Sequence, residues 1–344
     1  MLIKIFFIYF TVIFEYKTYI IMKKNVILIL FLMISGIVSA QQEPQISHNM
    51  FNNMAVNPGY AGIKGAICAT GIVRQQWVGF KDADGNKGSP QTFLLSIDAP
   101  VSLLRGGLGL TLLQDKLGFE KNTILKLNYA YHLHIGPGKL GLGLQAKFLN
   151  KEIDFEKFKP IEANDYVLQS GSKEKAMITD FSFGAFYNIP NKLYFGISSS
   201  QLSEAKTAFG ADLANVTLKR HYYVTAGYYY TLPPNPSFKL IPSVLLKSDG
   251  AVVQFDINTL LEYNNRFWGG VTYRNQDAIV VLLGLKPFTS GSYENLKIGY
   301  AYDITTSAIG ANKRSSGSHE IMIGYCFKIE VEHLPQSYKN VRFL

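Results

Sequence analysis

The stretch from residue 123 to residue 135 reads TILKLNYAYHLHI, and it alternates between two kinds of side chain. The apolar or aromatic set is Leu125, Leu127, Tyr129, Tyr131, Leu133 and Ile135. The polar or small set is Lys126, Asn128, Ala130, His132 and His134. Because successive side chains of a β-strand point to opposite sides, this period of two predicts a strand with one apolar and one mostly polar face.

The same period of two recurs at residues 221–232, 251–263, 295–304 and 320–331. Each segment runs to about ten residues or more, the length of a tilted membrane strand rather than the five or six usual in soluble sheets. Aromatic side chains gather near the ends of the apolar faces, where a barrel meets the membrane–water interface. Hydrophobic residues make up 47% of the chain and aromatics 13%, which is rich for an exported soluble protein. The pattern therefore favours a transmembrane antiparallel β-barrel over a soluble sandwich.

An all-β barrel of about fourteen strands is predicted, and the lengths of its connections alternate. Connections after even-numbered strands are mostly tight, as at residues 136–138, whereas several after odd-numbered strands are long. Short periplasmic turns and longer extracellular loops are typical of an outer-membrane barrel, and closure is required because lipid cannot hydrogen-bond an open strand edge. The long connections are 78–89, 153–177, 202–218 and 305–316. The predicted strands lie near 65–77, 90–99, 107–115, 121–135, 139–152, 178–189, 192–201, 219–232, 237–247, 251–263, 266–274, 277–286, 293–304 and 317–330.

Residues 22–40 have the pattern of a secretory signal peptide. Lys23 and Lys24 form a charged start, and an apolar core follows from Val26 to Ile34. The small residues at 38–40 form a cleavage site. The apolar core is too short to span a bilayer, so this segment predicts export and removal rather than a membrane anchor.

Residues 1–21 precede a second methionine, Met22, and we interpret them as a non-native extension from a misassigned start. The alternative is a genuine N-terminal membrane anchor. Glu15 and Lys17 interrupt its apolar run, which argues against that alternative. The mature chain is expected to begin at Gln41.

Several classes of function are disfavoured by the composition. The net charge of +9 comes with no basic cluster interleaved with aromatics, so nucleic acid is not an expected partner. His132 and His134 share a strand face, but no further ligand has a defined relation to them, and they are interpreted as polar lining. The glycines at 106, 107, 109, 141 and 143 lack the following helix or lysine of a phosphate loop and are interpreted as relieving crowding or allowing curvature. No catalytic, cofactor or metal site is predicted.

Two short motifs near the start of the mature chain are less periodic. Residues 50–62 read MFNNMAVNPGYAG, and residues 74–80 read RQQWVGF, followed by PQTF at 90–93. Together they resemble the PorP/SprF family, outer-membrane proteins of the type IX secretion system of Bacteroidetes. Gly59 replaces the family's usual alanine, and residues 53–55 depart from its common filler. The resemblance covers nearly all of 44–331. The family-motif candidates for partner binding are Phe51, Asn57, Pro58, Tyr60, Gly62, Arg74, Gln76, Trp77, Gly79 and Phe80.

This resemblance implies a non-enzymatic component that assists secretion or surface attachment of a cognate adhesin-like cargo, with a C-terminal sorting domain. It also implies gliding motility, contact with periplasmic secretion components and residence in outer-membrane lipid. The expected organisation is a periplasmic or lumenal motif segment at 41–64, a barrel at 65–331 and a periplasmic tail at 332–344. The alternative is a passive porin or solute channel. The motif segment and the tail favour the first function, because a simple porin needs neither.

Two charged or reactive positions on the first strand lead to structural expectations. Arg74 falls on the lumenal face, where a charge needs a partner, and Asp98 on the next strand is the candidate. Arg74 is interpreted either as interior electrostatics or as a direct partner-recognition residue. Cys68 and Cys326 also face the lumen, on the first and last strands, which pair in a closed even-stranded barrel. A disulfide requires their Cα atoms to lie within about 7 Å, and only the register decides this.

Overall fold

The computed structural model describes residues 43–81, 85, 88–158, 173–209, 214–288, 295–307 and 315–328. The chain divides into two units, residues 1–40 and 41–344, and only the second contains described residues. The predicted extension at 1–21, the signal peptide at 22–40 and the tail at 332–344 therefore lie outside the described part of the chain.

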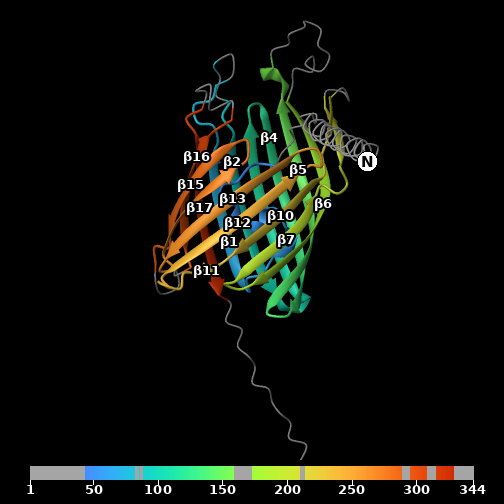
Figure 1. The fold of residues 1–344 in the computed structure, drawn as a ribbon. Coiled ribbons are helices and arrows are strands. Elements are labelled where there is room, and N and C mark those ends of the chain that lie inside the picture. Colours follow the sequence, from blue (N-terminus) through green and yellow to red (C-terminus); the bar gives the residue numbers. More distant parts are fainter. Residues whose placement is uncertain are drawn as a thin grey trace, which may run out of the picture. The chain divides into compact units, whose positions relative to one another are not determined.

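The described residues form a closed antiparallel β-barrel (Figure 1). Consecutive barrel strands pair with one another, and the β1–β17 and β10–β12 pairings complete the ring. The two-residue β11 continues β10 along the same partner, so the ring has fourteen strands, as predicted. The barrel strands are β1 Ala66–Gln75, β2 Gln91–Val101, β3 Gly106–Leu117, β4 Glu120–Ile135, β5 Gly138–Asp154, β6 Lys173–Ile189, β7 Leu193–Ser200, β10 His221–Tyr228, β11 Tyr230–Thr231, β12 Phe238–Ser248, β13 Val253–Tyr263, β14 Phe267–Arg274, β15 Ala278–Leu285, β16 Lys297–Thr305 and β17 Ser318–Lys328.

Two short strands stand apart from the ring. β8 (Lys206–Phe209) and β9 (Ala214–Thr217) form their own hairpin within the connection that the sequence predicted only as a long loop. The remaining regular structure is 3₁₀ turns: η1 Asn49–Phe51, η2 Asn53–Ala55, η3 Pro58–Tyr60, η4 Ser102–Leu104 and η5 Phe155–Lys157. In the part of the chain that is described, no helix has the length and hydropathy needed to span a membrane.

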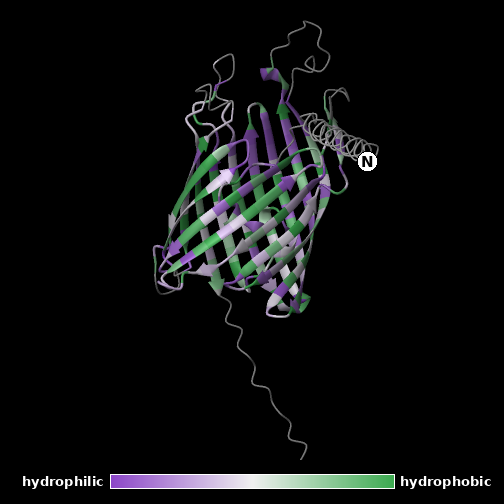
Figure 2. Cartoon of the chain, viewed as in Figure 1, coloured by the Kyte–Doolittle hydropathy of each residue, from purple (hydrophilic) through white to green (hydrophobic). Residues whose placement is uncertain are grey.

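The predicted alternation of faces is present in the strands (Figure 2). On β4, Lys126 and Asn128 are buried inside the barrel, whereas Leu127 is 46% exposed on the outside. On β16, Asp303 is buried and Ile298 is exposed. Removing apolar side chains from water is favourable, so an outer wall of this kind requires lipid around it. The fold and its hydropathy together agree with an outer-membrane barrel.

The two ends of the barrel differ in their connections. We call the end reached by Gln75, at the close of β1, the loop end, and the end at which β1 begins the turn end. The β6–β7 and β13–β14 connections at the turn end are short, and in the latter Asn264 and Asn265 adopt positive φ angles of 51° and 54°. Asparagine tolerates that conformation better than most residues. At the loop end, the longest connections between consecutive barrel strands follow β1, β5, β7 and β16.

Residues 43–64, which we call the inner segment, lie within the barrel. Near its start, the amide of Ser47 donates to Glu320, at the loop end of β17. Near its close, the amide of Gly62 donates to Asp98, towards the turn end of β2. The inner segment therefore runs along the lumen from the loop end to the turn end, where the chain enters β1.

Candidate functional site

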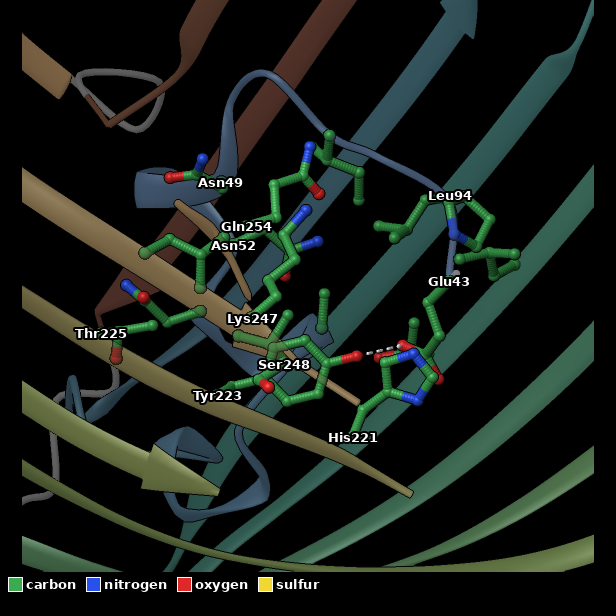
Figure 3. A pocket seen from close by; sticks show the side chains of 18 of the residues that line it. Glu43, Asn49, Asn52, Leu94, His221, Tyr223, Thr225, Lys247, Ser248 and Gln254 are labelled. Atoms are coloured by element: carbon green, nitrogen blue, oxygen red, sulfur yellow. Dashed lines mark hydrogen bonds between the residues drawn. The ribbon is translucent and has the colours of Figure 1, made fainter. Parts of the chain in front are cut away.

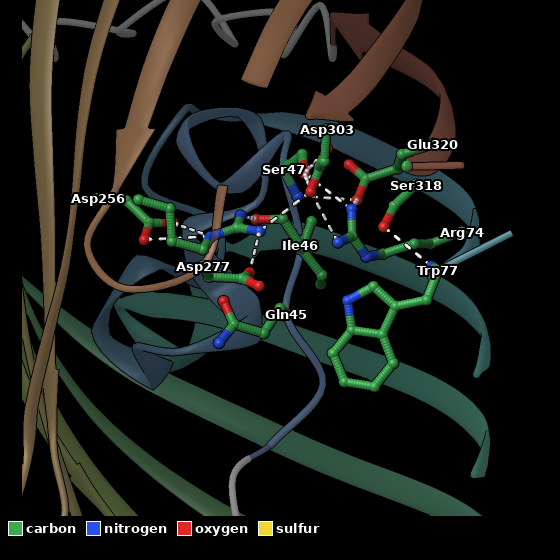
Figure 4. Close-up of polar contacts among 12 residues, drawn as sticks. Gln45, Ile46, Ser47, Arg74, Trp77, Asp256, Asp277, Asp303, Ser318 and Glu320 are labelled. Carbon is green, nitrogen blue, oxygen red and sulfur yellow. Dashed lines mark hydrogen bonds and ion pairs between the residues drawn. The ribbon is translucent and has the colours of Figure 1, made fainter. Parts of the chain in front are cut away.

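A network of buried charges fills the lumen near the loop end (Figure 4). Arg74 on β1 places Nη2 2.8 Å from Asp303 Oδ2 on β16 and Nη1 3.3 Å from Glu320 Oε2 on β17. The same guanidinium donates to Ser47 Oγ of the inner segment at 2.8 Å. All these side chains are almost fully buried, so their charges act on one another at low dielectric.

The predicted pairing of Arg74 with Asp98 is wrong. In the β1–β2 register, Asp98 stands opposite Cys68, and Arg74 stands opposite Thr92. Six residues along a strand span roughly 20 Å, which no side chain bridges. The partners of Arg74 come instead from β16 and β17, across the seam where the ring closes.

A second arginine extends the network. Arg274 Nε lies 3.3 Å from Asp256, and its Nη1 lies 3.1 Å from Asp303 Oδ2 and 3.4 Å from Asp277 Oδ2. Its Nη2 donates to the carbonyl oxygen of Ile46 at 3.4 Å. This arginine and its carboxylates were not predicted as a site from the sequence. The signal for Asp256, Arg274 and Asp303 was that they fall on the polar faces of the strands predicted at 251–263, 266–274 and 293–304.

The inner segment is held to this network through Glu320. Its two carboxylate oxygens accept from the amides of Ser47 and His48, at 2.7 and 2.8 Å. The ring Nδ1 of His48 lies 2.7 Å from the same carboxylate. Removing one partner from a network of buried charges leaves an uncompensated charge, which is costly. The network therefore fixes the position of the inner segment.

Glu43 makes a second anchor nearby. Its carboxylate lies 2.9 Å from Lys147 Nζ and 3.2 Å from Lys126 Nζ. The hydroxyl of Tyr223 donates to the same carboxylate at 3.5 Å (Figure 3). Burial raises the pKa of Glu43, but the two ammonium groups lower it by more, so that its pKa lies below the usual value. Glu43 is therefore charged at neutral pH.

Towards the turn end, the inner segment lies against a row of inward-facing glycines. A Cβ built on Gly143 would overlap the backbone of Pro58 and Gly59, and one on Gly184 would overlap Asn57 Oδ1. Gly107 and Gly141 meet the inner segment in the same way. These glycines do relieve crowding, as the sequence suggested, and the group they accommodate is the inner segment.

Asn57 and Tyr60 use the space that these glycines leave. Asn57 has the extended backbone expected ahead of a proline, and its Nδ2 donates to the carbonyls of Ala185 and Ile197, each at 3.0 Å. The ring of Tyr60 packs edge-on against Phe186, with centroids 5.1 Å apart. Both side chains are buried, so they contact the barrel wall rather than solvent.

The motif candidates separate into two groups. The first group lies inside the barrel, and it consists of Phe51, Asn57, Pro58, Tyr60, Gly62 and Arg74. The second group lies at the loop-end rim, and it consists of Gln76, Trp77, Gly79 and Phe80. Apart from half-buried Phe51, the first group is buried, and it holds the inner segment in place.

Trp77 has an unusual backbone at this rim. Its φ is 49°, in the left-handed region that bulky residues rarely adopt. Its amide donates to Ser318 Oγ at 3.1 Å, and its carbonyl accepts from the amide of Phe80 at 3.0 Å and from Ser89 Oγ at 2.9 Å. Strain of this kind persists only where surrounding contacts impose it, and it occurs often at functional sites.

The seam of the barrel is cross-linked. β1 pairs with β17, as predicted, and Cys68 stands directly opposite Cys326 with their Cα atoms 4.0 Å apart. The two residues form a disulfide, which the sequence left open.

The two histidines of β4 have different surroundings. His132 Nε2 lies 2.9 Å from the carbonyl oxygen of Ala61, in contact with the inner segment, and His134 is exposed. Among the described residues, no group of three or more His, Cys, Asp or Glu side chains is arranged to hold a metal ion.

The chain matches one family model and several solved structures. The family model of the type IX secretion system membrane protein PorP/SprF matches residues 38–325. No curated protein matches the chain. Among solved structures, the Ralstonia pickettii toluene transporter TbuX is 12% identical with a TM-score of 0.44, over 80% of this chain and 92% of that one. The Acinetobacter baumannii outer membrane protein Omp33 is 6% identical with a TM-score of 0.42, over 76% of this chain and 99% of that one.

Proposed function

Because this chain belongs to the family of type IX secretion system membrane proteins PorP/SprF, we propose that its barrel assists a cognate adhesin-like cargo protein to reach or attach to the cell surface. The barrel acts there as a non-enzymatic docking component. It contacts periplasmic secretion components at the opposite end from the cargo.

The observation that carries this proposal is the occupied lumen. The inner segment is bound at Glu43, at Ser47 and His48, and again at Asn57 and Gly62, by groups that belong to the barrel wall. A passive porin conducts through a water-filled lumen. A lumen filled by the chain's own residues supports a protein that works through its surfaces.

The rim residues are the proposed contact with cargo. Trp77 and Phe80 are half-buried side by side, with ring centroids 6.2 Å apart, and Trp77 is held at a positive φ. Aromatic side chains that are rigidly positioned at a surface are common anchors of protein interfaces. Arg74 and the buried motif residues act in this proposal by holding the inner segment and the rim in place.

Secretion of cargo by a strain carrying variants of this chain tests the proposal. Trp77→Ala with Phe80→Ala should remove most of the cargo from the cell surface while the barrel remains in the outer membrane. Phe158→Ala is the matched control, because it removes a loop-end aromatic outside the motif. Surface cargo is measured by proteomics of surface-labelled cells.

Two outcomes contradict the proposal. If deletion of the gene leaves the amount of cargo on the cell surface unchanged, the chain has no role in its secretion. A wild-type barrel that conducts small ions steadily in a planar bilayer supports the passive porin instead.

We also propose that the chain is processed before Gln41, resides in the outer membrane and keeps residues 332–344 on the periplasmic side. The charged start, apolar core and small-residue cleavage site of 22–40 support the processing step. Mass spectrometry of the mature N-terminus in the outer-membrane fraction tests it, and a mature species that retains residues 1–40 contradicts it.

A further inference from the structure

A cavity remains in the lumen beside the inner segment (Figure 3). It offers about 60 Å³ to the centres of water molecules. A single water needs about 10–15 Å³ by this measure, so the cavity has room for a handful of heavy atoms. Its wall combines apolar side chains, among them Leu94, Leu113 and Leu245, with a small set of polar ones.

The cavity reaches the loop end of the barrel. Ser248, Asp249 and Val252, at the connection between β12 and β13, form part of its wall. Asp249 Oδ1 accepts from the amides of Ala251 at 3.0 Å and Val252 at 2.8 Å, which gives this edge a defined shape. The cavity therefore borders the loop end of the barrel.

Among the described residues of the wall, Lys247 has no carboxylate within ion-pair distance, although Asp256 and Asp277 act on its charge from farther away. Lys126 also lines the cavity, but its charge is shared with Glu43. Lys247 Nζ has a hydrogen bond only to the amide oxygen of Gln45, at 3.3 Å. Within the described ranges, no Asp or Glu oxygen lies within 4 Å of Lys247 Nζ. An ammonium group that is withdrawn from bulk water favours an anion beside it.

Two buried hydrogen-bond donors line the same cavity and have no acceptor within the barrel. Asn52 Nδ2 and Thr225 Oγ1 make no hydrogen bond, although the two residues are each only 4% exposed. Buried polar groups are nearly always hydrogen-bonded, and an orphaned one costs about 1–3 kcal/mol. The wall thus carries three buried polar atoms without a partner, namely Asn52 Nδ2, Thr225 Oγ1 and the ring Nε2 of His221, beside a cation that forms no ion pair within 4 Å.

We propose that this cavity is a binding site for a small organic carboxylate, that is, a carboxylate group on a short apolar body. Lys247 supplies the charge, and rotation of the Asn52 and Thr225 side chains would turn their unpartnered donors toward the carboxylate. Leu94, Leu113 and Leu245 pack against the apolar body. A carboxylate of this kind is found on free short-chain acids and at the C-terminus of a peptide, and both fit the same chemistry.

Ligand-observed NMR titration of the purified full barrel in detergent tests the site, with butyrate and its neutral isostere butyramide as probes. Butyrate should bind at least tenfold more tightly than butyramide, because the two differ in charge and hardly in shape. Lys247→Met should weaken butyrate binding at least tenfold. Lys239→Met is the matched control, since Lys239 lies on the same face of β12 but outside the cavity wall, and it should change binding less than twofold.

A second variant guards against a folding defect in the first. Thr225→Val keeps the side-chain volume and removes the hydroxyl, and it should weaken butyrate binding at least threefold in a barrel of unchanged heat stability. The proposal is overturned if neither probe binds, if butyrate and butyramide bind alike, or if Lys247→Met leaves butyrate binding unchanged.

A third probe distinguishes a free short-chain acid from the C-terminus of a peptide as the source of the carboxylate. The tripeptide Ala-Ala-Val is compared with its C-terminal amide. Binding of the free acid alone, lost in Lys247→Met, identifies a chain terminus as an occupant. Binding of butyrate without the peptide restricts the site to free small acids.

Discussion

Replacing Gly143 by alanine should release the turn-end half of the inner segment while leaving the barrel wall intact. The added Cβ would overlap backbone atoms of Pro58 and Gly59, which cannot rotate away as a flexible side chain can. Gly324→Ala is the matched control. Gly324 also faces the lumen, but its Cβ would meet nothing closer than Thr70 Oγ1 at 3.8 Å, an ordinary van der Waals distance.

The size of the effect follows from the contacts that depend on this fit. Asn57 donates two hydrogen bonds to the wall, at about 1 kcal/mol each. Tyr60 is 7% exposed, and burying a ring of this size contributes about 1.5–3 kcal/mol. Losing both contributions would cost roughly 3–5 kcal/mol. Every 1.4 kcal/mol is a factor of ten, so local opening should become at least about a hundredfold more frequent.

Hydrogen exchange of the peptide covering residues 57–62 measures this opening directly. The amides of Gly59 and Gly62 donate to Asn57 Oδ1 and Asp98 Oδ2, and both should exchange at least about a hundredfold faster in Gly143→Ala than in Gly324→Ala. Heat-dependent electrophoretic mobility confirms that the barrel is folded in both variants. Equal exchange rates in the two variants would refute the conclusion that the row of inward-facing glycines holds the inner segment in place.

Three further outcomes are expected. Arg74→Met should lower the free energy of unfolding by about 3–5 kcal/mol, because it leaves Glu320 without its arginine and Asp303 with Arg274 alone. Exposed Arg266→Met should cost less than about 1 kcal/mol, and equal urea midpoints for the two variants contradict this prediction. Ile298→Arg should destabilise the folded barrel by about 2–4 kcal/mol, the cost of an arginine near the bilayer midplane, whereas lumenal Lys297→Gln should destabilise it much less. The heat-resistant folded fraction measures both effects, and equal losses of that fraction mean that the faces are wrongly assigned. Reductant should lower the free energy of unfolding of the wild type by up to roughly 5 kcal/mol and should leave that of Cys68→Ser unchanged. Thiol labelling of the wild type without reductant would show that the disulfide is absent.

The strands could be predicted closely because membrane burial imposes a strict period of two. β4, predicted at 121–135, spans Glu120–Ile135, and β12, predicted at 237–247, spans Phe238–Ser248. The β8–β9 hairpin was missed because its strands of four residues are too short to show a period. The number of strands was predicted by counting the candidate strands, and the alternation of short and long connections supported an outer-membrane barrel.

The site was less predictable because it depends on distant contacts. Arg74 was assigned correctly to the lumen, but its partners, Asp303 and Glu320, lie more than two hundred residues away in sequence. The course of the inner segment had no periodic signal, since its backbone is a series of single 3₁₀ turns. The nearest signal was Gly141 and Gly143 on one strand face, because glycine within a strand often marks the close approach of another backbone.

The path of the inner segment constrains the order of assembly. The chain descends from the loop end to the turn end and only then enters β1, which is bonded covalently to β17. Once the ring has closed, residues 43–64 could enter the lumen only by passing through it as an extended chain. The simplest order of assembly therefore places this segment among the strands before β1 and β17 pair. A folded reporter fused ahead of Glu43 would then be an obstacle to biogenesis even if it touched no functional residue.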